Sequence, residues 1–229
     1  MSGVVYRDFP RPPREVIEGF KELSATTVYE SIGQNIRSVM DPAIKPIAQD
    51  TKLVGPALTV LCYPGDNITV HKSMTIAKPG DVLVIEAGGQ IGVMWGGLMS
   101  YQAMKCGIAG VVVDGSVRDV TEIRRMGFPV FARHISPISS TKLHPGSINV
   151  PVVCGGVLVK PGDVIIGDDD GVVVVPREQA AEVLERARAR AKRESDILRE
   201  YDRGRTSFEL YGFEKVFKER GVAEYPMSQ

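Results

Sequence analysis

The sequence predicts an α/β fold, and three of its features support this. Short, nearly continuous runs of apolar and β-branched residues recur along the chain, as in strands that are covered on both faces. Segments with helical periodicity lie between these runs. Glycine- and proline-rich turns separate the two kinds of segment, and the turn Lys-Pro-Gly-Asp occurs twice, at 78–81 and 160–163. The repeated turn predicts two similar corners that each lead into a strand.

The first half of the chain is expected to alternate helices with strands. A proline-rich lead-in precedes a helix expected at 14–23, and Ser24 is placed to cap a second helix at 26–32. Residues 53–62 (LVGPALTVLC) are apolar and partly β-branched, which predicts a strand. The further elements expected in this half are a helix at 68–77, a strand at 82–86, a helix at 98–106, a strand at 110–113, a helix at 120–126 and a strand at 130–132.

The second half is expected to be mostly strands, followed by one long helix. Strands are predicted at 152–154, 164–166 and 172–175, and Pro176 then opens a helix that runs to about residue 201 and is more than twice the average length. Its single apolar stripe favours contact with a neighbouring subunit; the alternative is a solvated helix along its own domain. The aromatic residues of the tail predict docking onto a surface: Phe208, Tyr211, Phe213 and Phe217.

These elements predict three parts: a helical lead-in at 1–50, an α/β core at 51–176 and a helical extension at 177–229, which is expected to lie between subunits.

Basic and acidic residues number 28 each, which argues against broad nucleic-acid binding. No apolar run approaches the roughly 20 residues that span a bilayer. The start of the chain lacks the apolar stretch of a signal peptide. The three cysteines are far apart in apolar surroundings, which favours buried thiols in a reducing, cytoplasmic compartment.

A glycine-rich loop at 87–97 is the first candidate for ligand binding. It follows a predicted strand and ends at the start of the helix expected from Leu98, where the carboxyl ends of strands in open α/β folds usually bind ligands. The helix start offers unpaired N–H donors and a favourable dipole end, which predicts a site for a carboxylate or phosphate. The alternative is that Gly96-Gly97 forms only a tight turn.

A second loop, at 114–119, ends in the pair Arg118-Asp119 just before a predicted helix. Adjacent side chains at a helix start are expected to diverge, so that each serves another group. Asp119 is well placed as an N-cap, which is the structural alternative. Arg118 carries a planar guanidinium suited to carboxylates, which an N-cap alone does not require. The pair therefore predicts a ligand site.

A third loop, at 168–171, places three aspartates before a glycine. It lacks the alternating oxygen ligands and the late glutamate of a calcium loop, so it is predicted to be an acidic turn with Gly171 at positive φ. The three histidines lack metal-ligand spacing, and no zinc site is expected.

Several segments resemble one known family. PGDNITVH (64–71), the stretch from WGGLMSYQ to DGSVRDV (95–120), FPVFAR (128–133) and 146–177 are similar to the RraA-like superfamily. The resemblance is strongest to its 4-hydroxy-4-methyl-2-oxoglutarate / 4-carboxy-4-hydroxy-2-oxoadipate aldolases. It covers roughly residues 50 to 205, and Gly-x-Val-Arg-Asp is its most specific part.

The resemblance implies a swivelling β/β/α fold with a long carboxyl-terminal helix, assembled as a homotrimer or a homohexamer. It implies a class II pyruvate aldolase in which Asp119 holds Mg²⁺ or Mn²⁺ and Arg118 contacts the 2-oxo acid. It also implies that Glu194 approaches the site of a neighbouring subunit, where Glu194 or a metal-bound water is a candidate for the proton shuttle. The substrate carboxylate would be held by the backbone of Gly96, Gly97, Leu98 and Met99.

One residue departs from the aldolase pattern, and it leaves more than one function open. The aldolases carry an aspartate twenty residues before Arg-Asp, where this chain has Gly97. The leading hypothesis is a metal-dependent carbon–carbon lyase that releases pyruvate by retro-aldol cleavage or by decarboxylation of oxaloacetate. The alternatives are a non-catalytic regulator of ribonuclease activity and, from the segment VIEAGG at 84–89, a methyltransferase. No nucleic-acid or membrane partner is expected.

Overall fold

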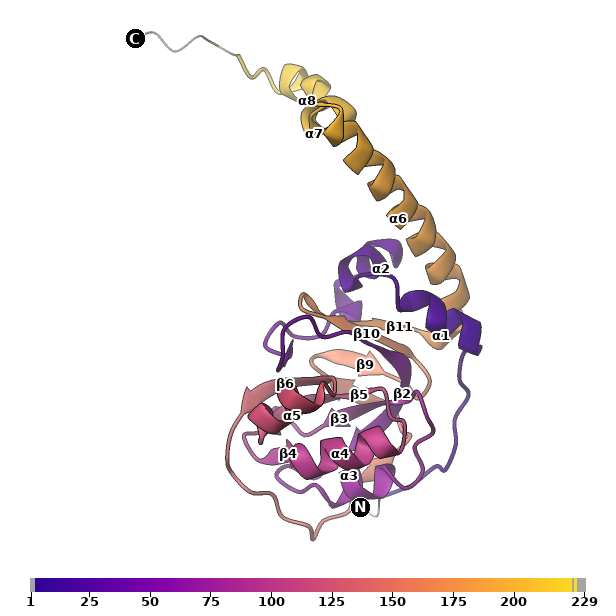
Figure 1. The fold of residues 1–229 in the computed structure, drawn as a ribbon, viewed down its shortest axis with the longest axis vertical. Coiled ribbons are helices and arrows are strands. Elements are labelled where there is room, and N and C mark those ends of the chain that lie inside the picture. The colour runs from indigo at the N-terminus through magenta and orange to yellow at the C-terminus, as the bar shows by residue number, and fades with distance from the viewer. Residues whose placement is uncertain (1–2, 224, 226–229) are drawn as a thin grey trace. The chain divides into compact units, whose positions relative to one another are not determined.

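The computed structural model describes residues 3–223 and 225. The chain divides into two compact units, 1–187 and 188–229. The first is a mixed α/β unit built on one large sheet, and the second is helical (Figure 1). Within the described residues, no helix is long and apolar enough to cross a bilayer.

The first unit is built on a sheet with a parallel centre. The strands are β1 (Lys45–Pro46), β2 (Leu53–Leu61), β3 (Val82–Glu86), β4 (Val93–Trp95), β5 (Gly110–Val117), β6 (Val130–Ile135), β7 (Ser147–Ile148), β8 (Val152–Cys154), β9 (Val157–Val159), β10 (Val164–Asp168) and β11 (Gly171–Val175). The main order is β1-β6-β5-β3-β2-β10-β11, with β2, β3, β5 and β6 parallel. The two ends of this order, β1 and β11, contact each other, so the sheet is nearly closed like a barrel.

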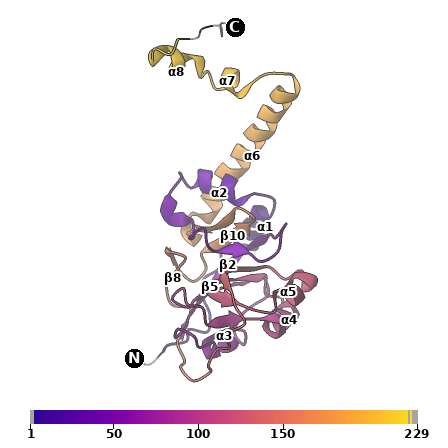
Figure 2. The same cartoon turned by 90° about the vertical axis from the view of Figure 1, so that its left-hand side faces the viewer.

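The helices of the first unit are α1 (Arg14–Phe20), α2 (Ala25–Ser31), α3 (Ile68–Ser73), α4 (Gly97–Lys105), α5 (Val120–Met126) and the first turns of α6 (Ala180–Asp202), with 3₁₀ turns η1 (Ile36–Ser38) and η2 (Arg177–Gln179). Helices α4 and α5 lie side by side in both views (Figure 1 and Figure 2). Because the central strands are parallel, their carboxyl ends and the starts of the helices that follow them lie at one edge of the sheet. The candidate functional site lies at this edge.

Strand residues alternate between two packed layers. Leu83 and Val111 point into a core that includes α3, α4 and α5, whereas Val84 and Val112 point into a core that includes the β8–β9 hairpin. A strand that is buried on both faces must be apolar throughout, as these are. The predicted α/β class and the continuous apolar strands are confirmed.

The expected elements form, with differences where the local pattern is weak. β5 runs to Val117 instead of 113 because its polar end pairs with β4 and β6, which only the tertiary structure provides. α3 ends at Ser73 instead of 77. The short strands β1, β4, β7 and β9 were not predicted, because two or three residues carry no readable periodicity.

The lead-in at 1–50 does not stand apart from the core at 51–176. Phe20 of α1 is fully buried, and the first turns of α6 bury Val183 and Ala187 in the same unit. Residue 187, and not 176, therefore ends the first compact unit. Cys62 and Cys154 are buried free thiols as expected, while Cys106 is half-buried.

The acidic loop at 168–171 is a turn, as predicted. Asp168 Oδ2 accepts a hydrogen bond from the Ala25 N–H at 2.7 Å, and Asp170 accepts one from Thr26 Oγ1 at 2.8 Å. Gly171 has φ of 141°. The carboxylates of this turn therefore hold the start of α2, whose N-cap is Ser24 as expected.

The second unit contains the rest of α6, then α7 (Ser207–Leu210) and α8 (Glu214–Glu219). A capping box between Thr206 and Glu209 starts α7. The ring of Phe208 packs edge-on against Phe213 at 6.2 Å and against Phe217 at 5.2 Å, so the tail aromatics form a cluster of their own. Docking of this cluster onto another surface stays a prediction.

Candidate functional site

The turn between β5 and α5 places Arg118 and Asp119 at the edge of the sheet. Asp119 has φ of 58°, in the left-handed region that Asp tolerates better than most residues. Its side chain makes no capping hydrogen bond to α5. Instead, Asp119 Oδ2 accepts a hydrogen bond from the Gly97 N–H at 3.1 Å. Asp119 is thus the N-cap residue of α5 by position, as the alternative expected, but its side chain caps no N–H of α5 and faces the start of α4 instead.

The expectation that the side chains of Arg118 and Asp119 diverge is wrong. Arg118 Nε lies 3.7 Å from Asp119 Oδ2, because the left-handed backbone at Asp119 brings its side chain back toward Arg118. This distance is an ion pair but exceeds a hydrogen bond. The two side chains are 46% and 41% exposed, so the guanidinium N–H groups and one carboxylate oxygen stay available to a ligand.

The start of α4 lies against Arg118 and Asp119. Glycine permits this close approach because it has no β-carbon. A β-carbon on Gly96 would lie 2.9 Å from Asp119 Oδ2, and one on Gly97 would lie 3.2 Å from Asp119 Cβ. The Gly97 N–H already donates to Asp119. The next two N–H groups of the first turn, those of Leu98 and Met99, have no intrahelical acceptor and are the donors left for an anion.

Glu122 was missed by the sequence analysis. A β-carbon on Gly97 would lie 2.7 Å from Glu122 Oε2, so this carboxylate occupies the space beside the glycine. Glu122 follows Asp119 by three residues, which places both on one face at the start of α5. The three-residue spacing from Asp119 is the feature of the sequence that could have identified Glu122 as a site residue. Both carboxylates therefore lie within 3.6 Å of one point, the β-carbon position of residue 97.

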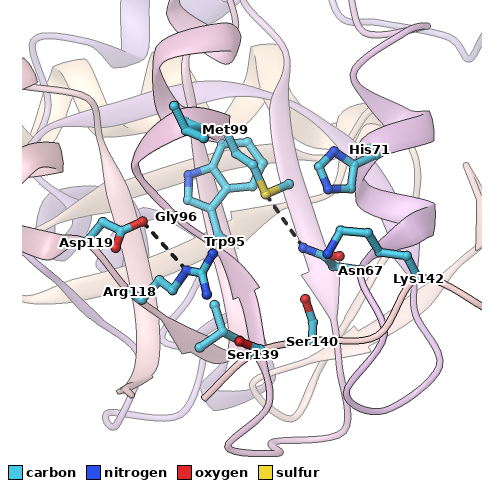
Figure 3. Close-up of a pocket in the computed structure, with 12 residues that line it drawn as sticks. Asn67, His71, Trp95, Gly96, Met99, Arg118, Asp119, Ser139, Ser140 and Lys142 are labelled. Atoms are coloured by element: carbon cyan, nitrogen blue, oxygen red, sulfur yellow. Dashed lines mark hydrogen bonds and ion pairs between the residues drawn. The ribbon is translucent and has the colours of Figure 1, made fainter. Parts of the chain in front are cut away.

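A pocket of about 240 Å³ opens beside this pair (Figure 3). Its lining residues are Asn67, His71, Val93, Trp95, Gly96, Leu98, Met99, Arg118, Asp119, Ser139, Ser140 and Lys142. The pocket thus brings together five of the predicted site residues, and Gly97 is not among its lining residues. A second hollow, of about 360 Å³, adjoins Arg118 and Asp119 at Ile135, Ser136 and Pro137.

The polar residues of the wall opposite Arg118 and Asp119 were not predicted, because they come from distant segments. Asn67 is the N-cap of α3 and His71 lies in the last turn of that helix, whereas Lys142 belongs to the loop between β6 and β7. Asn67 is 5% exposed, and its buried Oδ1 has no hydrogen-bond partner. A buried acceptor without a donor is uncommon and costs free energy, which a ligand or water can offset.

Asp66 fixes the loop that carries Lys142. Its fully buried Oδ2 accepts hydrogen bonds from Thr141 Oγ1 at 2.7 Å, from the Leu143 N–H at 2.6 Å and from the His144 N–H at 3.0 Å. Burial alone raises the pKa of Asp66, but these bonds and one from the Ile68 N–H outweigh it and hold the pKa well below its usual range. The loop is therefore held by a charged acceptor.

We expect Asp66→Asn to lower the free energy of unfolding by about 2 kcal/mol, because a buried network loses its charge. Since folding depresses this pKa, the stabilising contribution is fully present above the unfolded pKa of about 3.9 and is lost progressively as pH falls from that value through the lower pKa of the folded state. Urea denaturation at pH 7 measures the change. Asp202→Asn, at an exposed position on α6, is the control; equal stability of both variants would contradict the role of Asp66.

Glu194 belongs to the second unit, where its Oε1 pairs with Arg190 Nε at 2.9 Å. Its predicted approach to the site of a neighbouring subunit stays a prediction. The segment at 84–89 does not form the tight strand–helix turn of a nucleotide-type fold. After β3 the chain passes through Gly88 and Gly89 into β4, and α4 begins only at Gly97.

The residues at the site fit a hard divalent cation better than zinc. Asp119 and Glu122 offer carboxylate oxygens, and no group of three or more His, Cys, Asp or Glu side chains within the described residues could hold a metal ion. Mg²⁺ is commonly bound through one or two carboxylates, with water and substrate completing its octahedron. A closed structural zinc site requires four protein ligands.

Comparisons with known proteins identify the family of this chain. Residues 25–174 match a family model described as RraA-like, Aldolase/RraA. A Halalkalibacterium halodurans protein, provisionally named a 4-hydroxy-4-methyl-2-oxoglutarate aldolase, is 40% identical over 189 residues, which are 81% of this chain and 87% of that protein. The chain belongs to the RraA-like family.

Solved structures show the same fold in proteins with different descriptions. The Streptomyces coelicolor protein RraAS2, described as an unusual member of the RNase ES inhibitor RraA family, has a TM-score of 0.73 at 30% identity, over 86% of this chain and 100% of its own. An uncharacterized protein from Pseudomonas syringae has a TM-score of 0.78 at 28% identity, over 87% of this chain and 93% of its own. The RraA-like fold is therefore shown.

Proposed function

We propose that this RraA-like chain is a divalent-metal-dependent carbon–carbon lyase that acts on a 2-oxo acid and releases pyruvate. The observation that carries the proposal is the shared pocket in which Arg118 and Asp119 lie beside the free N–H groups at the start of α4. A carboxylate that can hold a cation and N–H donors that can bind an anion, together in one pocket, are suited to stabilising an enolate. The relatives named as aldolases support the same reaction class.

Each of these residues has one proposed role. Asp119 holds Mg²⁺ or Mn²⁺, which when bound polarises the keto oxygen of the substrate and offsets negative charge on it. Arg118 donates to that keto oxygen. The N–H groups of Leu98 and Met99 bind the adjacent carboxylate, which the dipole of α4 also favours. We propose further that Glu194 of a neighbouring subunit completes the site in a homotrimer or homohexamer.

The reaction breaks the bond between C3 and C4 of the 2-oxo acid. In the retro-aldol direction, a base accepts the proton of the C4 hydroxyl, the bonding pair stays on C3, and a second oxo acid leaves. In oxaloacetate decarboxylation, carbon dioxide leaves instead, and the same enolate of pyruvate remains. Protonation of C3 then yields pyruvate. Arg118 stabilises the enolate oxygen in both cases, so the proposed site suits both substrates.

The test is direct. Purified full-length protein is loaded with Mg²⁺ or Mn²⁺ and mixed with oxaloacetate or with 4-hydroxy-4-methyl-2-oxoglutarate, and pyruvate is measured with lactate dehydrogenase. We expect pyruvate from at least one substrate and loss of the activity on chelation. Absence of pyruvate above the background of the metal alone, from both substrates, refutes the proposal.

We expect Glu122→Gln to lower kcat by about 10-fold to 100-fold, the usual effect of a group that orients the surroundings of a metal. The Glu122 carboxylate fills the space beside Gly97, where the aldolases carry aspartate, and we propose that it orders water in the site and relays protons. Arg125→Gln, an exposed charge change on the same helix, is the control. Equal rates for Glu122→Gln and the unchanged protein would remove Glu122 from the mechanism.

A second candidate is a non-catalytic regulator of ribonuclease activity. The glycine at position 97 and the likeness to proteins described as RNase or RNA-processing inhibitors favour it. The intact Arg118–Asp119 pair, beside a pocket, favours the lyase. Inhibition of a purified ribonuclease by this chain, together with no heat of Mg²⁺ or Mn²⁺ binding in calorimetry, would reverse the order of the two candidates.

A further inference from the structure

Two adjacent glycines form the start of α4, where the proposed lyase needs a fixed backbone. A β-carbon on Gly96 would lie 2.9 Å from Asp119 Oδ2, and one on Gly97 would lie 2.7 Å from Glu122 Oε2, so glycine is required at both positions. Glycine backbones sample more conformations than those of other residues, and Gly96, the N-cap, has no side chain to cap the helix. The first turn of α4 therefore depends on bonds from other residues to keep its N–H groups in one orientation.

A buried serine of α4 supplies such a bond. The Ser100 Oγ donates to the Gly96 C=O at 3.2 Å, and the Ser100 N–H donates to the same oxygen at 3.0 Å. Because the Gly96 C=O and the Gly97 N–H belong to one planar peptide group, a fixed carbonyl also fixes the direction of that N–H, which donates to Asp119. The Ser100 hydroxyl therefore acts on the peptide group that faces the Arg118–Asp119 pair.

Trp95 orients the hydroxyl of Ser100. The indole Nε1–H donates to Ser100 Oγ at 2.7 Å, and both side chains are fully buried. A hydroxyl has one hydrogen and two acceptor lone pairs, so an Oγ that accepts from the indole still has its hydrogen to donate to Gly96. A serine that bonds back to the fourth preceding carbonyl is common in helices, whereas the buried indole donor is an addition to that pattern. Bonds in such a chain strengthen one another in an interior of low polarity.

Trp95 is also part of the pocket. Figure 3 shows it between Arg118 on one side and Asn67 and His71 on the other. Its backbone C=O accepts a hydrogen bond from the Arg118 N–H at 3.1 Å. Trp95 therefore connects the residue that is proposed to donate to the keto oxygen with the peptide group that begins α4.

We propose that Ser100 is a positioning residue of the lyase site. It holds Gly96 through a hydroxyl that Trp95 orients, and it thereby aligns the N–H donors in the first turn of α4 with the substrate carboxylate. The proposal rests on the proposed function, in which those donors bind the carboxylate. Ser100 does not line the pocket, so its effect on a ligand passes through the residues to which it is bonded.

The experiment measures the binding of pyruvate, the proposed product, to the Mg²⁺-loaded full-length protein by calorimetry. We expect Ser100→Ala to weaken pyruvate binding by about 10-fold, because misaligned N–H groups form weaker hydrogen bonds to a carboxylate. In steady-state assays, the KM for oxaloacetate should rise by about 10-fold while kcat falls less, since Arg118 and Asp119 remain. A fall in kcat with an unchanged KM and unchanged pyruvate affinity would overturn the proposal.

The matched control is Ser31→Ala. Ser31 is a buried serine of α2 whose Oγ donates to the Thr27 C=O at 2.7 Å, so it makes the same kind of helix bond, and it does not line the pocket. We expect Ser31→Ala to lower the melting temperature and to leave pyruvate affinity unchanged. Equal losses of pyruvate affinity in both serine variants would indicate a general effect of stability and would overturn the role of Ser100.

Trp95→Phe tests the path from Ser100 to the site. Phenylalanine keeps an aromatic ring but has no N–H donor, so the Ser100 hydroxyl loses the bond that orients it. If the two residues act as one unit, the loss of pyruvate affinity in the double variant should be smaller than the two single losses combined. Additive losses would overturn the proposal. An unchanged pyruvate affinity in Trp95→Phe would also overturn it, even if Ser100→Ala did not fold.

The outcomes separate this inference from the proposed function. Pyruvate production by the unchanged protein, with normal pyruvate affinity in Ser100→Ala, keeps the lyase and rejects the role of Ser100. A coupled loss of pyruvate affinity in the Ser100 and Trp95 variants, without pyruvate release from oxaloacetate or 4-hydroxy-4-methyl-2-oxoglutarate, keeps the positioning role and rejects the lyase. No binding of pyruvate by the unchanged protein rejects both.

Discussion

Arg118→Ala is expected to lower kcat for pyruvate release by about 10²- to 10³-fold, the usual loss when one donor to a developing oxyanion is removed. Its guanidinium is half exposed and lies 3.7 Å from Asp119, so it is available to an oxygen of the substrate. Steady-state assays with oxaloacetate measure the change. Because the side chain is nearly half exposed, we expect little change in melting temperature.

Arg118→Lys separates geometry from charge. Lysine keeps the positive charge but loses the planar fork, so its activity should lie between those of the alanine variant and the unchanged protein. If Arg118→Ala retained full activity, the enolate would have to be stabilised elsewhere, and the proposed mechanism would fall.

Asp119→Asn is expected to weaken Mg²⁺ or Mn²⁺ binding by more than about 100-fold and to remove lyase activity with it, since the anionic ligand is lost. Asparagine suits the test better than alanine. It tolerates the left-handed backbone at this position, φ of 58°, and can still accept the hydrogen bond from the Gly97 N–H. The fold should therefore persist.

Calorimetric titration with Mn²⁺ measures the metal affinity of Asp119→Asn, and circular dichroism measures whether its fold persists. Asp196→Asn, an exposed aspartate paired with Arg199 on α6, is the control and should bind the metal normally. Unchanged metal affinity in Asp119→Asn would place the cation elsewhere and would separate metal binding from the Arg118–Asp119 pair.

The local sequence was enough to predict the fold class and most of the central elements. The strand at 82–86 has the predicted bounds because a strand that is buried on both faces must be apolar throughout. The strand at 152–154 and the helix at 120–126 also have the predicted bounds. The position of Arg118 and Asp119 after a strand also followed from the sequence. Their role was inferred from the family resemblance, and the RraA-like family is confirmed by comparison.

What the sequence could not predict comes from pairings between distant segments. The polar end of β5, at 114–117, becomes a strand only because β4 and β6 lie beside it. The left-handed backbone of Asp119 turns its side chain from the N-cap position to Gly97, and no residue pattern specified that. Glu122 could have been found, since it follows Asp119 by three residues, but its relevance depends on the space beside Gly97.

The sequence by itself determined the layered α/β fold, the glycine-rich start of α4 and the Arg118–Asp119 pair, because these depend on the character and order of neighbouring residues. Only the tertiary structure decided which other residues share the pocket. His71 and Lys142 are 71 positions apart, and they meet because Asp66 holds the loop at 141–144 against the start of α3. Contacts of that kind depend on how the chain closes on itself, which local periodicity does not encode.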